Sequence, residues 1–155
     1  MITKAEYDDL REILELQYLS YQSEGDLFGS RNIPPLTQTL DEIIDEFYKE
    51  VILKMVIHDK IIGFVRAVEK KGTVYIGKLM VHPDFRGKGY GSMLLAEIES
   101  CFPEKRNELF TSTKSIDNVR LYQKSGYTVF DSRVFNDEIT FVYLEKHSKN
   151  QEMIK

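Results

Sequence analysis

The most informative part of the sequence is Leu79-Met80-Val81-His82-Pro83-Asp84-Phe85-Arg86-Gly87-Lys88-Gly89-Tyr90-Gly91-Ser92. It begins as the end of an apolar strand, passes through a glycine-rich turn and continues into a helix. Glycines at 87, 89 and 91 let the backbone turn several N–H groups towards one point, because glycine adopts left-handed conformations readily. A helix N-terminus adds unpaired N–H donors and the positive end of the helix dipole. Together with the charges of Arg86 and Lys88, these features predict a binding site for an anion.

The spacing of the glycines disfavours two common anion-binding loops. A P-loop ends in Gly-Lys-Ser/Thr, whereas Lys88 is followed here by Gly89. The glycines also lack the Gly-x-Gly-x-x-Gly spacing of dinucleotide-binding loops. ATP and NAD are therefore disfavoured as ligands.

Outward from this loop, strand-length apolar runs alternate with turn residues. The runs before the loop are 51–57, 61–68 and 73–81, and they predict three consecutive antiparallel strands. After the loop we expect a helix over 91–102 that ends before Pro103, and a strand over 109–113. A short helix over 117–124, closed by Gly126, then leads to a strand pair over 127–133 and 138–144.

The first 50 residues predict a short strand at 2–4 and two helices. The first helix has an amphipathic stripe and should stop before Gly25, with a loop over 24–38 after it. Thr39 and Glu42 form a capping box that opens the second helix. The stripes expected to be buried are Leu10, Ile13, Leu14, Tyr18 and Tyr21 in the first helix, and Leu40, Ile43, Ile44, Phe47 and Tyr48 in the second.

The length and composition of the chain fit one globular domain. The 155 residues are 42% hydrophobic and 30% charged, and a chain of this length buries roughly 70% of the surface that its unfolded form exposes. No repeat, low-complexity tract or long linker divides it. We therefore expect a single domain over 1–146 and a polar tail over 147–155.

Neither a membrane nor a metal is expected as a partner. The longest stretch without Asp, Glu, Lys or Arg is 32–40, far shorter than the roughly 20 apolar residues of a membrane helix. The charged N-terminus lacks the apolar core of a secretory signal. The single Cys101 is not expected to anchor a zinc site, because no Cys or His lies near it at metal-ligand spacing. It lies near a helix end without a basic neighbour to form a thiolate, so it is expected to be a small buried residue. These features predict a cytoplasmic protein without a metal.

The charge of the chain is unevenly distributed. The net charge is -4, yet residues 1–50 carry twelve acids and four bases (net -8), and the rest thirteen acids and seventeen bases (net +4). The sequence pI near 5.5 argues against a nucleic-acid partner, because binding to phosphates usually requires a basic face. A small anionic ligand remains compatible with the basic part.

The loop and its flanks resemble the GNAT superfamily of N-acetyltransferases. The pyrophosphate-binding motif of that family, Gln/Arg-x-x-Gly-x-Gly/Ala, is matched by Arg86-Gly87-Lys88-Gly89-Tyr90-Gly91. The expected order of elements from about residue 2 to residue 144 is also similar to the GNAT order. The resemblance implies an α/β fold with a mixed, mainly antiparallel sheet flanked by helices. It also implies that acetyl-CoA lies in a splay beside the third long strand and the strand that follows.

A second motif supports the resemblance. In this family an Asn on the next helix commonly touches the pantetheine, and a Tyr four residues later donates a proton to the thiolate. Asn118 and Tyr122 have that spacing and share a helical face. Tyr122 is the expected catalytic residue, since a tyrosine with its ordinary pKa near 10 is protonated at neutral pH and can protonate a leaving thiolate.

The resemblance assigns the other cofactor-binding positions. Backbone groups of Leu79, Met80 and Val81 would pair with the pantetheine, and an N–H there would stabilise the oxyanion. The residues expected at the pyrophosphate are Arg86, Gly87, Lys88, Gly89, Tyr90, Gly91 and Ser92.

The function implied is transfer of an acetyl group from acetyl-CoA to a primary amine by direct attack on the thioester. A non-catalytic acyl-CoA-binding sensor or regulatory module and a nucleotide-binding regulatory domain are the alternatives. The sequence leaves open the acceptor, a small molecule or a peptide, and the choice between a monomer and a homodimer. It also leaves open the general base, for which Glu69 and Tyr75 are weak candidates. In this family the acceptor lies beside the first two helices, so Glu24 and Asp26 between them favour a cationic amine.

Overall fold

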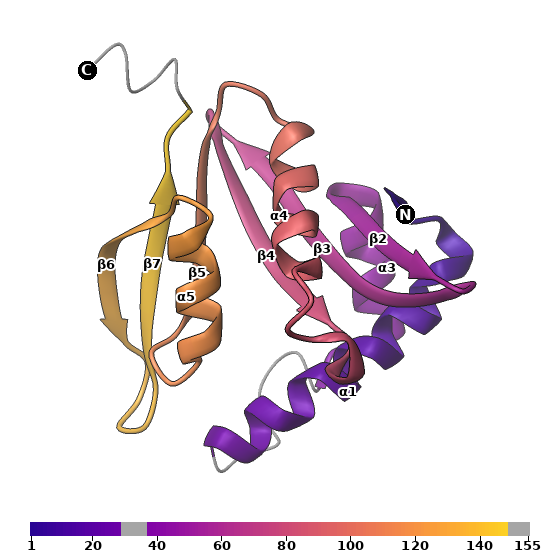
Figure 1. Cartoon of the computed structure of the whole chain (residues 1–155), viewed down its shortest axis with the longest axis horizontal. Helices are drawn as coiled ribbons and strands as arrows, with labels where there is room; N and C mark the ends of the chain where they lie inside the picture. The colour runs from indigo at the N-terminus through magenta and orange to yellow at the C-terminus, as the bar shows by residue number, and fades with distance from the viewer. Residues whose placement is uncertain (29–36, 149–155) are drawn as a thin grey trace.

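The structure of the chain, a computed structural model, describes residues 1–28 and 37–148. Its centre is a seven-stranded sheet (Figure 1). In sheet order the strands are β1 (Ile2–Lys4), β2 (Val51–Ile57), β3 (Lys60–Lys70), β4 (Thr73–Val81), β5 (Arg106–Ser112), β7 (Thr140–Lys146) and β6 (Thr128–Val134). All neighbouring strands are antiparallel except β4 and β5, which are parallel. The mixed, mainly antiparallel sheet expected from the sequence is therefore confirmed.

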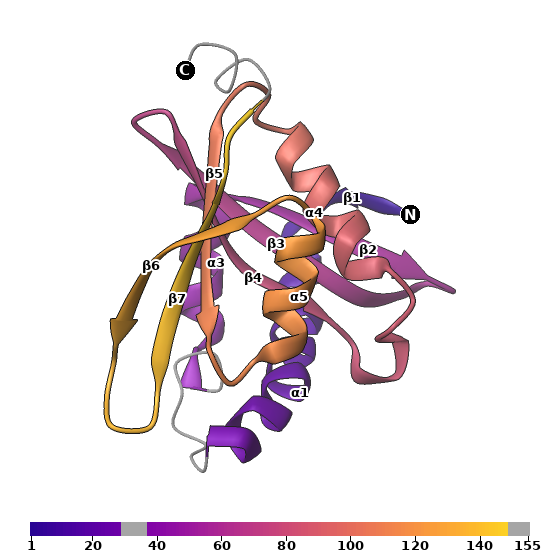
Figure 2. The ribbon, with the colours of Figure 1, turned by 60° about the vertical axis from the view of Figure 1, so that its left-hand side comes forward.

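Helices cover both faces of the sheet, as Figures 1 and 2 show. One face carries α1 (Leu10–Phe28), which follows the short helix η1 (Tyr7–Asp9), and α3 (Leu40–Lys49). The other face carries α4 (Tyr90–Ser100) and α5 (Ile116–Lys124). The chain passes from β4 through α4 to β5, which is the helical crossover that a parallel strand pair requires.

Each face of the sheet buries its own hydrophobic cluster. On the α4 and α5 face, Leu94, Leu95 and Ile98 of α4 are fully buried against residues of β3, β4, β5 and β7. On the other face, Ile13 of α1 and Ile43 of α3 pack against β2, β3 and β4. Strand β4 therefore contributes to both clusters, and its position is fixed from both sides.

Local signals in the sequence predict most element boundaries to within a few residues. The bounds of β2 and β4 are those expected, and the capping box of α3 forms, with the Glu42 amide donating to Thr39 Oγ1 at 3.2 Å. Strand β5 begins at Arg106, three residues earlier than expected, and α4 ends at Ser100, two residues earlier.

The expected end of the first helix is wrong. Helix α1 continues through Gly25 to Phe28, so the backbones of Glu24 and Asp26 are helical and do not lie in a loop. A single glycine costs a helix interior only about 1 kcal/mol relative to alanine, so Gly25 alone does not end α1. The rest of the predicted loop, 29–36, lies outside the described residues.

Two burial predictions are also wrong. Tyr48 is 72% exposed because it lies at the margin of the α3 stripe, where its ring meets the edge of Phe47 at 5.2 Å between centroids. Cys101 is exposed because α4 ends just before it, and its Sγ contacts the Glu97 carbonyl oxygen at 3.5 Å. Burial of part of the thiol raises its pKa, which disfavours the reactive thiolate.

Candidate active site

The glycine-rich loop carries an uncapped helix N-terminus. Strand β4 ends at Val81, the short helix η2 (Pro83–Phe85) follows, and Gly89 is the N-cap of α4. Gly87 and Gly89 have φ of 76° and 85°, in the left-handed region, and a Cβ built on either would meet nothing within 4 Å. No side chain caps the first turn of α4. The N–H groups of this turn are thus available to an anion, which fits the pyrophosphate of a CoA molecule.

The two cations of the loop have different surroundings. The Lys88 ammonium lies 5.5 Å from the centroid of the Phe85 ring. Arg86 instead binds backbone carbonyls: its Nε donates to Val81 at 3.3 Å and its Nη2 to Ser20 of α1 at 3.1 Å. The Ser20 hydroxyl also donates to the Val81 carbonyl, at 3.5 Å. Arg86 therefore connects the loop to the helix on the opposite face of the sheet.

Beside the loop, the sheet opens between β4 and β5. These strands pair only through 73–75 and 106–108. Beyond that point, residues 109–112 of β5 pair with β7, and β4 has no strand partner on that side among the described residues (Figure 1). The edge of β4 at Leu79, Met80 and Val81 therefore borders a splay that leads to the loop.

A β-bulge interrupts β4 within the splay. Phe64 pairs with Met80 and Arg66 with Gly77, so two residues, Lys78 and Leu79, oppose the single Val65. Lys78 has a φ of 50°. A bulge leaves its extra residue without a partner in the hydrogen-bond ladder between the strands, and it changes the direction of the local backbone. It can therefore direct a backbone N–H of this segment into the splay.

The structure brings Asn118 and Tyr122 to the same face as the loop. Both lie on α5, and a Cβ built on Gly91 at the start of α4 would lie 3.2 Å from Leu121 Cδ2 of α5. Tyr122 is 6% exposed, within the cluster that includes Leu94 and Leu109, and Asn118 is half-buried. The side chains of Glu24 and Asp26 lie outside the described residues.

The opposite face of the splay carries aromatic rings. Phe110 of β5 is 53% exposed, and its ring lies 5.4 Å from that of Tyr143, stacked, and 5.2 Å from that of Phe141, edge to face. The paired neighbours Leu109 and Leu144 point to the α4 and α5 face. Because side chains alternate along a strand, Phe110 and Tyr143 face the side that carries α1 and α3.

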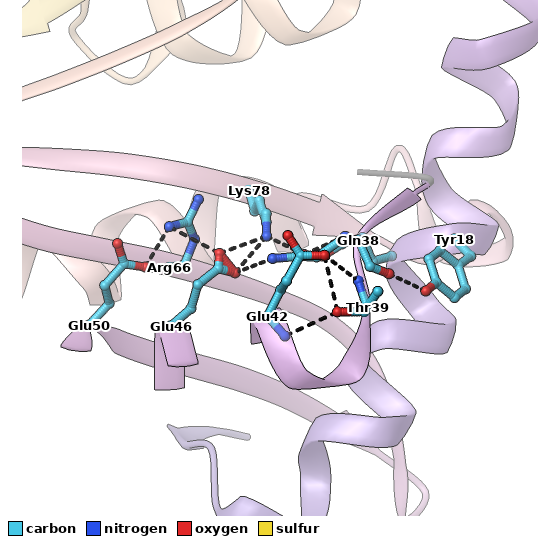
Figure 3. A network of polar contacts seen from close by, with 9 residues as sticks. Tyr18, Gln38, Thr39, Glu42, Glu46, Glu50, Arg66 and Lys78 are labelled. Atoms are coloured by element: carbon cyan, nitrogen blue, oxygen red, sulfur yellow. Dashed lines mark hydrogen bonds and ion pairs between the residues drawn. The ribbon is translucent and has the colours of Figure 1, made fainter. Parts of the chain in front are cut away.

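A polar network on that same side contacts the bulge, and the sequence analysis missed it (Figure 3). Lys78 Nζ lies 2.6 and 2.9 Å from the two carboxylate oxygens of Glu46 and also donates to Gln38 Oε1. Arg66 Nη1 lies 3.3 Å from Glu46 and 2.5 Å from Glu50. Burial lowers the pKa of the Lys78 ammonium, while the hydrogen bond that it donates to Glu46 opposes that shift. The i, i+4 spacing of Glu46 and Glu50 was the only local signal, and Glu50 itself is the extended C-cap residue that follows α3.

Within the described ranges, no three His, Cys, Asp or Glu side chains are grouped so that they could hold a metal ion. The helices in these ranges are also too short or too polar to cross a membrane.

The fold is thus an α/β fold with helices on both faces of a mixed sheet, which opens between β4 and β5 beside the uncapped N-terminus of α4. The family profile described as "Acetyltransferase (GNAT) domain" matches residues 47–129, more than half of the chain. The chain therefore belongs to the GNAT acetyltransferase family, as the resemblance implied.

Solved structures share the fold at low sequence identity. The PaiA N-acetyltransferase of Thermoplasma acidophilum, in complex with coenzyme A, has a TM-score of 0.80 and 18% identity, covering 95% of this chain and 98% of that one. The YncA protein of Salmonella typhimurium, with its cofactor acetyl-CoA, has a TM-score of 0.75 and 17% identity, covering 95% and 92%.

A curated relative, the UPF0157 protein YqkA of Bacillus subtilis (strain 168), is 29% identical over 118 residues. The match covers 76% of this chain and 34% of YqkA, so the chain spans about a third of that protein.

Proposed function

We propose that the protein transfers an acetyl group from acetyl-CoA to a primary amine. The uncapped N-terminus of α4 carries this proposal, because it presents backbone donors and two left-handed glycines at the mouth of the β4 and β5 splay. Membership of an acetyltransferase family and the coenzyme A in the PaiA structure support it. A non-catalytic acyl-CoA-binding module is the competing function.

Each predicted site residue has a role in this reaction. The amides at 87–92 bind the pyrophosphate, and Lys88 and Arg86 add positive charge beside it. The edge of β4 at Leu79, Met80 and Val81 pairs with the pantetheine amides, and Asn118 contacts the pantetheine from α5. A backbone N–H at the bulge donates to the acetyl oxygen as negative charge develops there.

The amine nitrogen attacks the acetyl carbon directly, so no covalent enzyme intermediate forms. As the new C–N bond forms, the C–S bond breaks, and the Tyr122 hydroxyl gives its proton to the departing sulfur. The surplus proton of the amine passes to solvent or to a base that remains unassigned, and Tyr122 is then reprotonated from solvent. The amine reaches the splay from the face that carries Phe110 and Tyr143, because the loop and α5 occupy the other face.

A thiol-release assay with acetyl-CoA and a panel of primary amines tests this function. We expect free CoA to appear at least 10-fold faster with the best amine than without one, and the acetylated amine to accumulate in equal amount. Tight binding of acetyl-CoA by calorimetry with no amine-dependent release would favour the acyl-CoA-binding module instead.

The acceptor is proposed to be cationic. The acidic first third of the chain and the aromatic rings beside the splay both attract cations. We expect amines with two or more positive charges to have the highest kcat/KM, and this value to fall as salt rises towards about 0.5 M, where the screening length is roughly 4 Å.

Charge reversal provides the control for this prediction. The double variant Glu24→Lys with Asp26→Lys should lower kcat/KM for a dication about 10-fold and leave a monocationic amine nearly unchanged. Glu97→Lys with Glu104→Lys makes the same change in net charge outside the first third of the chain and should have little effect. A best acceptor that is neutral or acidic apart from its amine, with salt-independent kinetics, would contradict this part of the proposal.

A further inference from the structure

The bulge in β4 has a backbone conformation that its sequence does not favour. Lys78 has a φ of 50°, a left-handed conformation that lysine seldom adopts, since its Cβ crowds the backbone there. Glycine or asparagine would adopt it more readily. Something outside the strand must therefore hold Lys78 in place.

Polar contacts with α3 and the residues before it hold the Lys78 side chain. The Lys78 side chain is 13% exposed, and its ammonium contacts both oxygens of the Glu46 carboxylate (Figure 3). Gln38 Oε1 accepts a further hydrogen bond from the same ammonium. Gln38 is in turn held by Gln17 of α1, whose Nε2 lies 2.8 Å from Gln38 Oε1. The bulge is thus connected to α1 and α3, both fixed by the hydrophobic cluster on that face.

Gly77, the residue before the bulge, lies close to the Arg66 side chain. A Cβ built on Gly77 would lie 2.8 Å from Arg66 Nη2, so a side chain at this position would require the guanidinium to move. The same guanidinium binds Glu46 and Glu50. Glu46 therefore contacts both Lys78 and Arg66, the residue that lies opposite Gly77 in the neighbouring strand.

We propose that Glu46, acting through Lys78, is a positioning residue that fixes the β4 bulge and so aims its backbone N–H at the acetyl oxygen. Neither side chain touches the reacting atoms in this role. The inference rests on the proposed acetyl transfer for its kinetic consequence, whereas the fixing of the bulge is a structural statement that can be measured without turnover.

Substitutions at Lys78 separate backbone conformation from side-chain charge. Lys78→Gly removes the charge but adopts a positive φ unaided, so we expect kcat within about 3-fold of the parent. Lys78→Val removes the same charge and strongly disfavours a positive φ, so we expect kcat to fall at least 20-fold while the dissociation constant of CoA changes less than 3-fold. If Lys78→Gly loses as much kcat as Lys78→Val, the ammonium itself is needed and the proposal is wrong.

The variant Glu46→Gln tests the carboxylate of the Lys78–Glu46 ion pair. We expect it to lower kcat about 10-fold, and the double variant Lys78→Gly with Glu46→Gln to recover the kcat of Lys78→Gly. Asp45→Asn is the matched control, since it breaks an exposed ion pair with Lys49 on the same helix and should leave kcat unchanged. Failure of the double variant to recover would overturn the proposal.

Nuclear magnetic resonance supplies the readout that does not depend on turnover. Cross-strand contacts that place Lys78 and Leu79 opposite Val65 should persist in the parent, in Lys78→Gly and in the double variant, and should be lost or broadened in Lys78→Val and Glu46→Gln. An unchanged register in all four variants would show that the ion pair does not fix the bulge. Because these contacts exist with or without catalysis, failure here is distinct from failure of the proposed function.

Discussion

Replacement of Gly89 by aspartate is expected to weaken CoA binding at least 100-fold. Gly89 is the N-cap of α4, and a Cβ built there would meet no atom within 4 Å, so a side chain has room beside the uncapped amides. An aspartate carboxylate would place a negative charge beside those amides and repel the pyrophosphate. Calorimetric titration of the folded variant with CoA measures the loss.

Two matched variants separate charge at the site from backbone strain. Gly89→Asn brings a similar side chain to the same left-handed position without a charge, and we expect it to weaken binding only about 10-fold. Gly72→Asp introduces the same residue at a φ of 84°, again with nothing within 4 Å. Gly72 precedes the first residue of β4, roughly 31 Å from the end of that strand at about 3.4 Å per residue, so this variant should bind CoA like the parent. If Gly89→Asp also binds like the parent, the loop is only a turn.

The parts of this molecule that follow from local chemistry were predictable from its sequence. The left-handed glycines, the helix start at Tyr90 and the capping box at Thr39 each depend on residues within four positions of one another. The strand bounds of 73–81 follow equally from a strand-length, mainly apolar run after the turn residues 70–72. Such signals do not depend on the rest of the fold, so the loop and its flanking elements could be placed.

The features that depend on tertiary contacts could not be predicted. Lys78 is a bulge residue because Glu46, 32 positions earlier in the chain, reaches it from α3. Gly77 and Lys78 interrupt the apolar pattern of β4, but this local signal does not show that two residues of β4 oppose Val65. Gly25 indicates a helix end, yet the penalty of one glycine is small enough for α1 to continue. The conformation of the glycine-rich loop was therefore predictable, while the polar contacts around the β4 bulge were not.

Replacement of Tyr122 by phenylalanine is expected to lower kcat about 100-fold with CoA affinity nearly unchanged. Loss of the hydroxyl removes the group that protonates the departing thiolate, and a positioned general acid contributes about this much to the rate. The aromatic ring, buried beside α4, is preserved, so the fold should tolerate the change. Steady-state kinetics with saturating amine, together with calorimetry for CoA, separates the two parameters.

The neighbouring Tyr127 provides the control for this variant, because its ring lies 6.2 Å from that of Tyr122 and its hydroxyl donates to Glu99 at 2.6 Å. Tyr127→Phe removes the same atom from a buried tyrosine of the same cluster, and we expect a loss of stability of about 1–2 kcal/mol with unchanged kcat. If both variants lower kcat equally, the effect of Tyr122 is one of packing. If Tyr122→Phe keeps the parental kcat while chemistry limits the rate, the thiolate takes its proton from another donor, and Tyr122 only fills the space between α5 and the sheet.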